Sequence, residues 1–268
     1  MNSSRIVLSN FDPDTVIHPE DKAVISRLRR IPGFSLFLRN TVGRLQSSLA
    51  EVTYTGNGYQ INQKNNPNIY NRFVEDCEIL GLKDIPLLSV AWGYFISSRC
   101  AGAKKHHVIM TSGSVDLLSS DELDFLFGHE LGHIICGHIP YHMLVETLYM
   151  SHSNGKMVNA VKLPLLGWYR ISHYTADRVG LLCCQDINVA LRTMIKMAGL
   201  PKECYEEIDI ESFIKQAEDF EIQHAEMSDQ IVKLFSIISA NSPWLVLRAK
   251  KLLEWYNSDE YKNLLGQR

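Results

Sequence analysis

The residues best suited to chemistry lie in one short segment, Phe127-Gly128-His129-Glu130-Leu131-Gly132-His133. The two histidines are four apart, so on a helix both imidazoles face the same side, about 5–6 Å apart at Cβ. That spacing suits a single zinc ion with Zn–N bonds of about 2.0–2.1 Å. Glu130 follows the first histidine, so it lies beside the metal and can take a proton from a metal-activated water. The segment predicts a hydrolytic zinc site with Glu130 as the general base.

A catalytic zinc site needs a third protein ligand and an open fourth position. His138 is five residues after His133 and lies beyond the helix end that we expect at Gly137. Its simplest interpretation is therefore a polar residue at a helix terminus, with metal binding as the alternative. The nearest downstream candidates for the third ligand are Cys136, His138 and His142.

A second histidine with a nearby carboxylate occurs forty residues beyond His133, where His173 and Asp177 are four apart on a long predicted helix. That spacing puts both side chains on one face. His173 could bind the metal, and Asp177 could accept the N–H of a metal-bound imidazole and hold it in one tautomer. The spacing alone is a weak signal, because a His and an Asp four apart are also common neighbours on helix surfaces.

Three short runs rich in β-branched and aromatic residues precede the H-E-x-x-H segment, at 87–90, 94–98 and 107–111. Turns at Trp92-Gly93 and Ala101-Gly102 separate them, which predicts a small antiparallel sheet. Ser120 or Asp121 then begins a helix that carries the motif to about Gly137. We therefore expect an α+β protein, mostly helical, with the sheet packed beside the H-E-x-x-H helix. The other segments with helical spacing are 21–30, 35–49 and 68–80, then 141–150, 157–163, 168–184, 187–198, 210–219, 222–239 and 244–256.

The composition is that of an ordinary globular protein, with 46% hydrophobic and 21% charged residues in a chain of 268. A formal net charge of -3 gives no reason to expect a nucleic-acid partner. Apolar runs end well before the roughly 20 residues that cross a bilayer, so we expect no transmembrane segment. The six cysteines contain no C-x-x-C pair, which favours free thiols in a reducing compartment. The predicted location is the cytoplasm.

A linked set of motifs between residues 103 and 261 carries a family resemblance. Its members are His107–Gly113, Asp121-Glu122-Leu123, Gly128–Ile134, Gly137-His138, Arg170, Ser172, Ala176-Asp177-Arg178, Pro243, Arg248 and Trp255. Together they resemble the gluzincin metallopeptidases, which include HtpX-type membrane proteases, CAAX prenyl-protein endopeptidases and small soluble minigluzincins. The resemblance implies a gluzincin catalytic domain, which we assign to residues 81–268. We expect residues 1–80 to be a helical N-terminal extension packed on it.

The chain departs from the family pattern at two positions. The family's usual third zinc ligand is a Glu in a Glu-x-x-x-Asp motif, and here His173 stands in that position, with Asp177 as the carboxylate. Three imidazoles form a neutral ligand set, so the ion would keep its full positive charge. The family often has Thr-His-Pro near its C-terminal Arg, where this chain has Asn241-Ser242-Pro243. Ser242 thus replaces a donor to the oxyanion, and such a donor is worth about 100-fold or more in rate.

The resemblance implies a zinc-dependent endopeptidase that acts on peptides or unfolded proteins and holds one zinc ion per chain on His129, His133 and His173. It also implies charge or oxyanion support from Ser242, Arg248 or Arg178, although each arginine could equally be the partner of a buried carboxylate. The alternative function is a catalytically weak or latent zinc-binding module that serves as a protein-interaction domain. Glu130 favours the enzyme, because a purely structural zinc would not require it.

Overall fold

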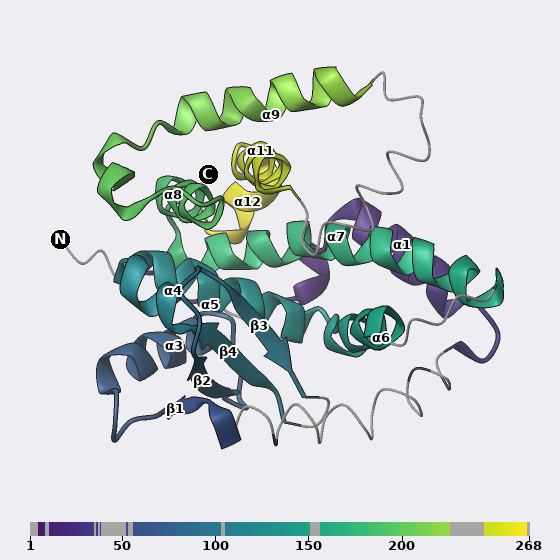
Figure 1. The fold of residues 1–268 in the computed structure, drawn as a ribbon, viewed down its shortest axis with the longest axis horizontal. Helices are drawn as coiled ribbons and strands as arrows, with labels where there is room; N and C mark the ends of the chain where they lie inside the picture. Colours follow the sequence, from purple (N-terminus) through teal and green to yellow (C-terminus); the bar gives the residue numbers. More distant parts are fainter. Residues whose placement is uncertain are drawn as a thin grey trace.

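A computed structural model describes residues 5–8, 11–34, 36, 38, 52, 56–102, 105–150, 156–225 and 244–266 of the chain. The fold is mostly helical with one small sheet, as predicted (Figure 1). No helix in these ranges is long and apolar enough to cross a membrane. The elements are η1 (Pro13–Thr15), α1 (Pro19–Arg29), β1 (Tyr59–Ile61), α3 (Pro67–Ile79), β2 (Leu87–Ala91), β3 (Ser98–Ala101), β4 (His107–Thr111), α4 (Ser112–Leu117), α5 (Ser120–Ile135), α6 (Ile139–Met150), α7 (Lys156–Cys184), α8 (Ile187–Met197), η2 (Lys202–Glu207), α9 (Ile210–Ala225), α11 (Leu245–Tyr256) and α12 (Asp259–Leu264).

Helix α5 carries the H-E-x-x-H segment and lies between the sheet and α7 (Figure 1). Its start is set by a capping box, in which the Ser119 hydroxyl accepts from the Glu122 N–H and the Glu122 carboxylate accepts from the Ser119 N–H. Its end is set by Gly137, whose φ of 70° suits the left-handed position after a helix C-cap. Both ends agree with the predicted limits.

Glycines let α5 and α7 approach each other closely. A Cβ added to Gly132 would lie 2.9 Å from the Val179 Cβ and 3.0 Å from the Ala176 Cα. A Cβ added to Gly128 would lie 2.7 Å from the Cys183 Sγ. These distances are shorter than ordinary carbon contacts of about 3.5–4.0 Å, so the two helix axes could not be so close with larger residues. The close approach is what brings side chains of α7 to the histidines of α5.

The sheet has four strands in the order β1-β2-β4-β3 and is mixed, which corrects the expectation of an antiparallel sheet. β1 pairs with β2 and β3 pairs with β4 in antiparallel fashion, but β2 and β4 are parallel. Residues 92–97 carry the chain past β4, so β3 pairs on the far side of β4 and not as a hairpin with β2. The third strand is Ser98–Ala101 instead of 94–98, because serine and threonine side chains of β4 and α4 bind the backbone of residues 93–97 as a loop.

The predicted helices at 21–30, 68–80, 187–198 and 244–256 agree with α1, α3, α8 and α11 within two residues. Segments 157–163 and 168–184 form one continuous helix, α7, although the sequence predicted two helices separated by residues 164–167. Packing of α7 against α5, α6, α1 and α11 outweighs the local preference for a break. Most of segments 35–49 and 222–239 lies outside the described residues.

The described elements of the N-terminal third of the chain pack on the same structure. β1 extends the sheet, α3 packs on α5, and α1 lies along α7 (Figure 1). The sequence pattern did not predict β1. Helix α1 begins at Pro19, a position where the missing N–H of proline is tolerated because the first turn has no intrahelical acceptor for it. Asp21, in the same turn, is buried.

Candidate metal centre

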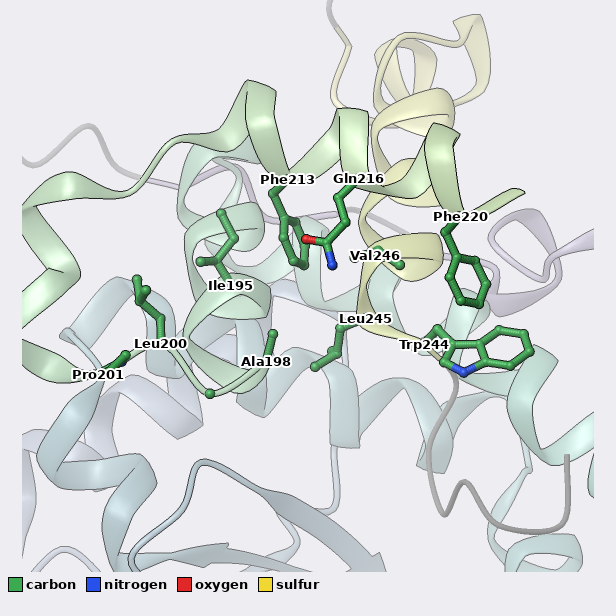
Figure 2. Close-up of a pocket in the computed structure, with 11 residues that line it drawn as sticks. Ile195, Ala198, Leu200, Pro201, Phe213, Gln216, Phe220, Trp244, Leu245 and Val246 are labelled. Atoms are coloured by element: carbon green, nitrogen blue, oxygen red, sulfur yellow. The ribbon is translucent and has the colours of Figure 1, made fainter. Parts of the chain in front are cut away.

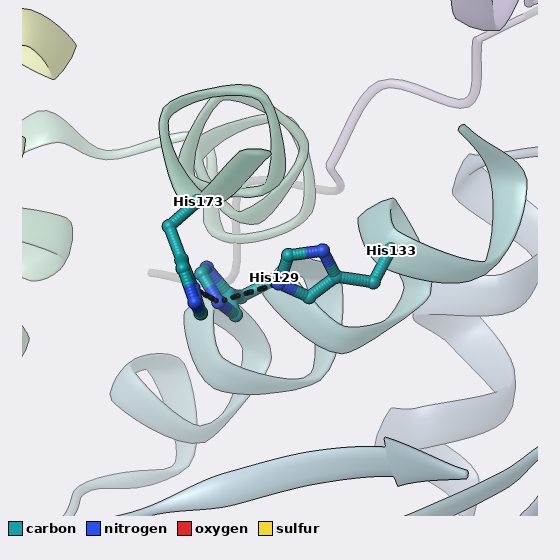
Figure 3. A group of neighbouring side chains, drawn as sticks. All are labelled: His129, His133 and His173. Atoms are coloured by element: carbon teal, nitrogen blue, oxygen red, sulfur yellow. Dashed lines mark hydrogen bonds between the residues drawn. The ribbon is translucent and has the colours of Figure 1, made fainter. Parts of the chain in front are cut away.

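Three histidines converge between α5 and α7 (Figure 3). His129 and His133 project from one face of α5, as their spacing of four predicts, and His173 reaches them from α7. The His129 Nε2 is 3.2 Å from the His133 Nε2 and 3.1 Å from the His173 Nδ1. His129 and His133 are buried and His173 is half-buried. The structure thus brings together the three residues that the resemblance implied as ligands.

The chemistry of these nitrogens fits a cation at their centre. A neutral His129 that donates from Nδ1 has only a lone pair at Nε2, and that lone pair faces two other ring nitrogens. Burial lowers the pKa of His133 and of His173, and neighbouring histidines lower both further. The charge of Arg248 also lowers the pKa of His173, so a proton shared among the rings is disfavoured. A tetrahedral ion with bonds of about 2.0–2.1 Å separates its ligand atoms by roughly 3.3 Å, close to the observed spacing. The three imidazoles could therefore hold a metal ion.

Asp177 and Arg248 hold His129 in one tautomer. The His129 Nδ1–H donates to the Asp177 Oδ1 at 2.8 Å. Arg248 donates to both oxygens of the same carboxylate, at 2.6 and 2.8 Å, and both residues are almost fully buried. Burial alone would raise the pKa of Asp177, but the charge and hydrogen bonds of Arg248 and the bond from His129 outweigh it and lower the pKa. Arg248 is thus the partner of a buried carboxylate.

Glu130 lies on α5 beside the three histidines and is anchored by the sheet. The Ser98 hydroxyl, at the start of β3, donates to the Glu130 Oε1 at 2.6 Å. Burial raises the pKa of Glu130, and the nearby His129, the Ser98 hydrogen bond, Arg99 and Arg248 reduce that rise without cancelling it. A carboxylate with a raised pKa is a better proton acceptor than a free glutamate. No sequence signal pointed to Ser98.

Two further candidate residues lie outside the cluster of three histidines, and a third is not among the described residues. Arg178 donates to the Val16 carbonyl at 3.3 Å and lies over the Trp255 ring. His138 is buried, and its Nδ1 lies 3.0 Å from the His133 Nδ1, so it contacts a member of the triad without joining it. Ser242 lies outside the described residues.

A pocket of about 600 Å³ lies elsewhere, between α8, α9 and α11 (Figure 2). It is lined mainly by apolar side chains, among them Phe213, Phe220 and Trp244. None of the three histidines lines it, nor does Glu130. Its chemistry offers no group for hydrolysis, so the histidine cluster is the better candidate for the active site.

Comparison with known proteins agrees with this geometry. The chain is 27% identical over 267 residues to a protein of Arabidopsis thaliana named plastoglobule-localized metallopeptidase 48, chloroplastic, covering 97% of this chain and 77% of that one. No solved structure matches the chain significantly. The model of peptidase family M48, whose members are metal-dependent, matches residues 99–256, a stretch that includes the H-E-x-x-H segment, His173 and Arg248. The chain belongs to peptidase family M48.

Proposed function

We infer that this chain is a zinc-dependent endopeptidase of the gluzincin type, with one zinc ion on His129, His133 and His173. The observation that carries the proposal is the convergence of three ring nitrogens from α5 and α7 beside the buried Glu130. His173 in place of a carboxylate leaves the ligand set neutral. A zinc ion bound there would polarise the scissile carbonyl and acidify a water molecule.

Glu130 is the general base in this proposal. Its carboxylate removes a proton from the attacking water as the water oxygen bonds to the carbonyl carbon. It then delivers that proton to the amide nitrogen as the C–N bond breaks. The Ser98 hydroxyl holds the carboxylate in place, and the Asp177–Arg248 pair keeps the His129 Nε2 free of hydrogen. Glu130 and His129 are thus both held in a fixed orientation before substrate binds.

The substrate class follows from the position of β3. β3 is an edge strand of the described sheet and packs on α5. Its first residue, Ser98, contacts Glu130. An extended peptide can add to such an edge through main-chain hydrogen bonds, which suit peptides and unfolded segments of many sequences. We therefore propose peptide or unfolded protein substrates.

Two further proposals concern the whole chain. Residues 1–80 form an extension that packs on the catalytic domain of 81–268, supported by ion pairs of Arg5 and of Arg72 with the buried Asp124. All six cysteines are free, which supports a reducing compartment such as the cytoplasm.

The test replaces Glu130 with Gln, which keeps the shape of the side chain but cannot accept the proton. Hydrolysis of unfolded casein should fall about 100-fold or more, while zinc content and the far-UV spectrum stay unchanged. Glu203→Gln, an exposed glutamate far along the chain, is the matched control and should behave as the parent. A chelator should stop hydrolysis and added Zn²⁺ should restore it. Activity within a few-fold of the parent in Glu130→Gln would refute the assigned role.

A further inference from the structure

A buried chain of hydrogen bonds leads from His133 to the N-terminal helix α1. The His133 Nδ1 lies 3.0 Å from the His138 Nδ1, and the His138 Nε2 lies 3.1 Å from the Asp21 Oδ2. The three residues are 2%, 2% and 1% exposed. Asp21 lies outside the stretch matched by the family model, which begins at residue 99.

The chemistry of each group sets the direction of these bonds. If His133 presents a lone pair at Nε2 to a metal, its proton must be on Nδ1, where it donates to the His138 Nδ1. His138 then carries its own proton on Nε2 and donates it to Asp21, which accepts as a carboxylate. The opposite direction would put a proton on the His133 Nε2 and block it as a ligand. Metal binding by the His133 Nε2 is therefore possible only when the hydrogen bonds run from His133 through His138 to Asp21.

Asp21 is itself firmly held. The Trp168 Nε1–H donates to its Oδ1 at 2.7 Å, and the Thr175 hydroxyl donates to its Oδ2 at 2.6 Å. Burial alone would raise the pKa of Asp21, but the bonds from His138, Thr175 and Trp168 outweigh it and lower the pKa. Asp21 thus remains an acceptor for three donors, two of them on α7.

We propose that Asp21, acting through His138, is a positioning residue for His133 and holds it in the tautomer that offers Nε2 to the metal. This inference rests on the proposed assignment of His129, His133 and His173 as ligands. It gives the N-terminal segment a defined part in the active site. Each of the two α5 histidines is then oriented by a carboxylate. Asp177 accepts a hydrogen bond directly from His129, and Asp21 acts on His133 through the His138 ring.

A second metal site is the competing explanation, because His133, His138 and His142 also offer three nitrogens within 4.8 Å. The His138 Nε2 is already bonded to Asp21, and the His142 Nε2 to the Ser172 hydroxyl. A cation among the Nδ1 atoms would have to replace the proton between His133 and His138. The observed hydrogen bonds already use the Nδ1 atoms of His133 and His138 without an ion, so the arrangement predicts one zinc per chain.

Asp21→Asn tests the proposal sharply. The Trp168 Nε1 can only donate, so the amide oxygen should turn to Trp168 and the NH₂ group to His138. His138 would then accept at Nε2 and donate from Nδ1, which moves the His133 proton to Nε2. Zinc affinity, measured by competition with a chromophoric chelator, should fall roughly 10–100-fold. Nitrogen NMR of the metal-free chain should show the proton of His133 on Nε2 instead of Nδ1.

Glu20→Gln, an exposed carboxylate on the same helix, is the matched control and should leave both measurements unchanged. A second pair of variants guards against a folding defect. His138→Asn places an amide oxygen near the site of the ring Nδ1 and should keep affinity within a few-fold, whereas His138→Leu should lose as much as Asp21→Asn. If Asp21→Asn binds zinc as tightly as the parent, or if the parent binds two zinc ions per chain, Asp21 does not position His133 through His138. A parent chain that binds no stoichiometric zinc would overturn the ligand assignment along with this role.

Discussion

Gly132→Ala should weaken metal binding although Gly132 touches no metal. The added Cβ would lie 2.9 Å from the Val179 Cβ and 3.0 Å from the Ala176 Cα. Because ordinary carbon contacts are about 3.5–4.0 Å, α5 and α7 must move apart by about 0.5–1 Å. Ala176 lies between His173 and Asp177 on α7, so both shift away from His129 and His133. Metal–ligand distances tolerate only about 0.2 Å, and we expect zinc affinity to fall about 10-fold or more.

The assay is chelator competition together with thermal unfolding of the metal-free chain. Overpacking should lower the free energy of unfolding by about 1–3 kcal/mol. The higher helix propensity of Ala, about 1 kcal/mol better than Gly, should offset part of that loss. Gly167→Ala, on α7 where an added Cβ would meet no described atom within 4 Å, is the control and should bind zinc as the parent does. If Gly132→Ala also binds zinc within two-fold of the parent, close helix packing does not set the geometry of the site.

Two other substitutions probe the site directly. His173→Ala should lower zinc affinity strongly because it leaves only two protein ligands, while His173→Glu should restore binding by supplying a carboxylate. If His173→Ala and the parent have equal affinity in the same competition assay, His173 is not a ligand. Ser98→Ala removes a hydrogen bond that lowers the pKa of Glu130, so that pKa should rise further. The base works only when ionised, so the acid limb of the kcat/KM profile should move to higher pH, and an unmoved limb would contradict the role of Ser98.

Much of the local structure followed from the sequence because its signals are short in range. The spacing of His129 and His133 predicts one helix face, and the start predicted at Ser120 or Asp121 agrees with the observed start at Ser120, which the capping box of Ser119 and Glu122 sets. The sheet was predicted less well. Short turns suggested hairpins, but which strands become neighbours depends on where residues 92–97 lead the chain, and no local pattern encodes the parallel pairing of β2 with β4.

The candidate site divides in the same way. His129, Glu130 and His133 are determined by the sequence, because one helical turn places them, and the family resemblance added His173 and Asp177. Only the tertiary structure pairs Ser98 with Glu130, 32 residues apart, and Asp21 with His138, 117 residues apart. Such pairs depend on how closely elements distant in the sequence pack. The packing of β3 on α5 decides the first pair and the packing of α1 on α7 decides the second. A pattern of spacing along the chain carries no information about either contact.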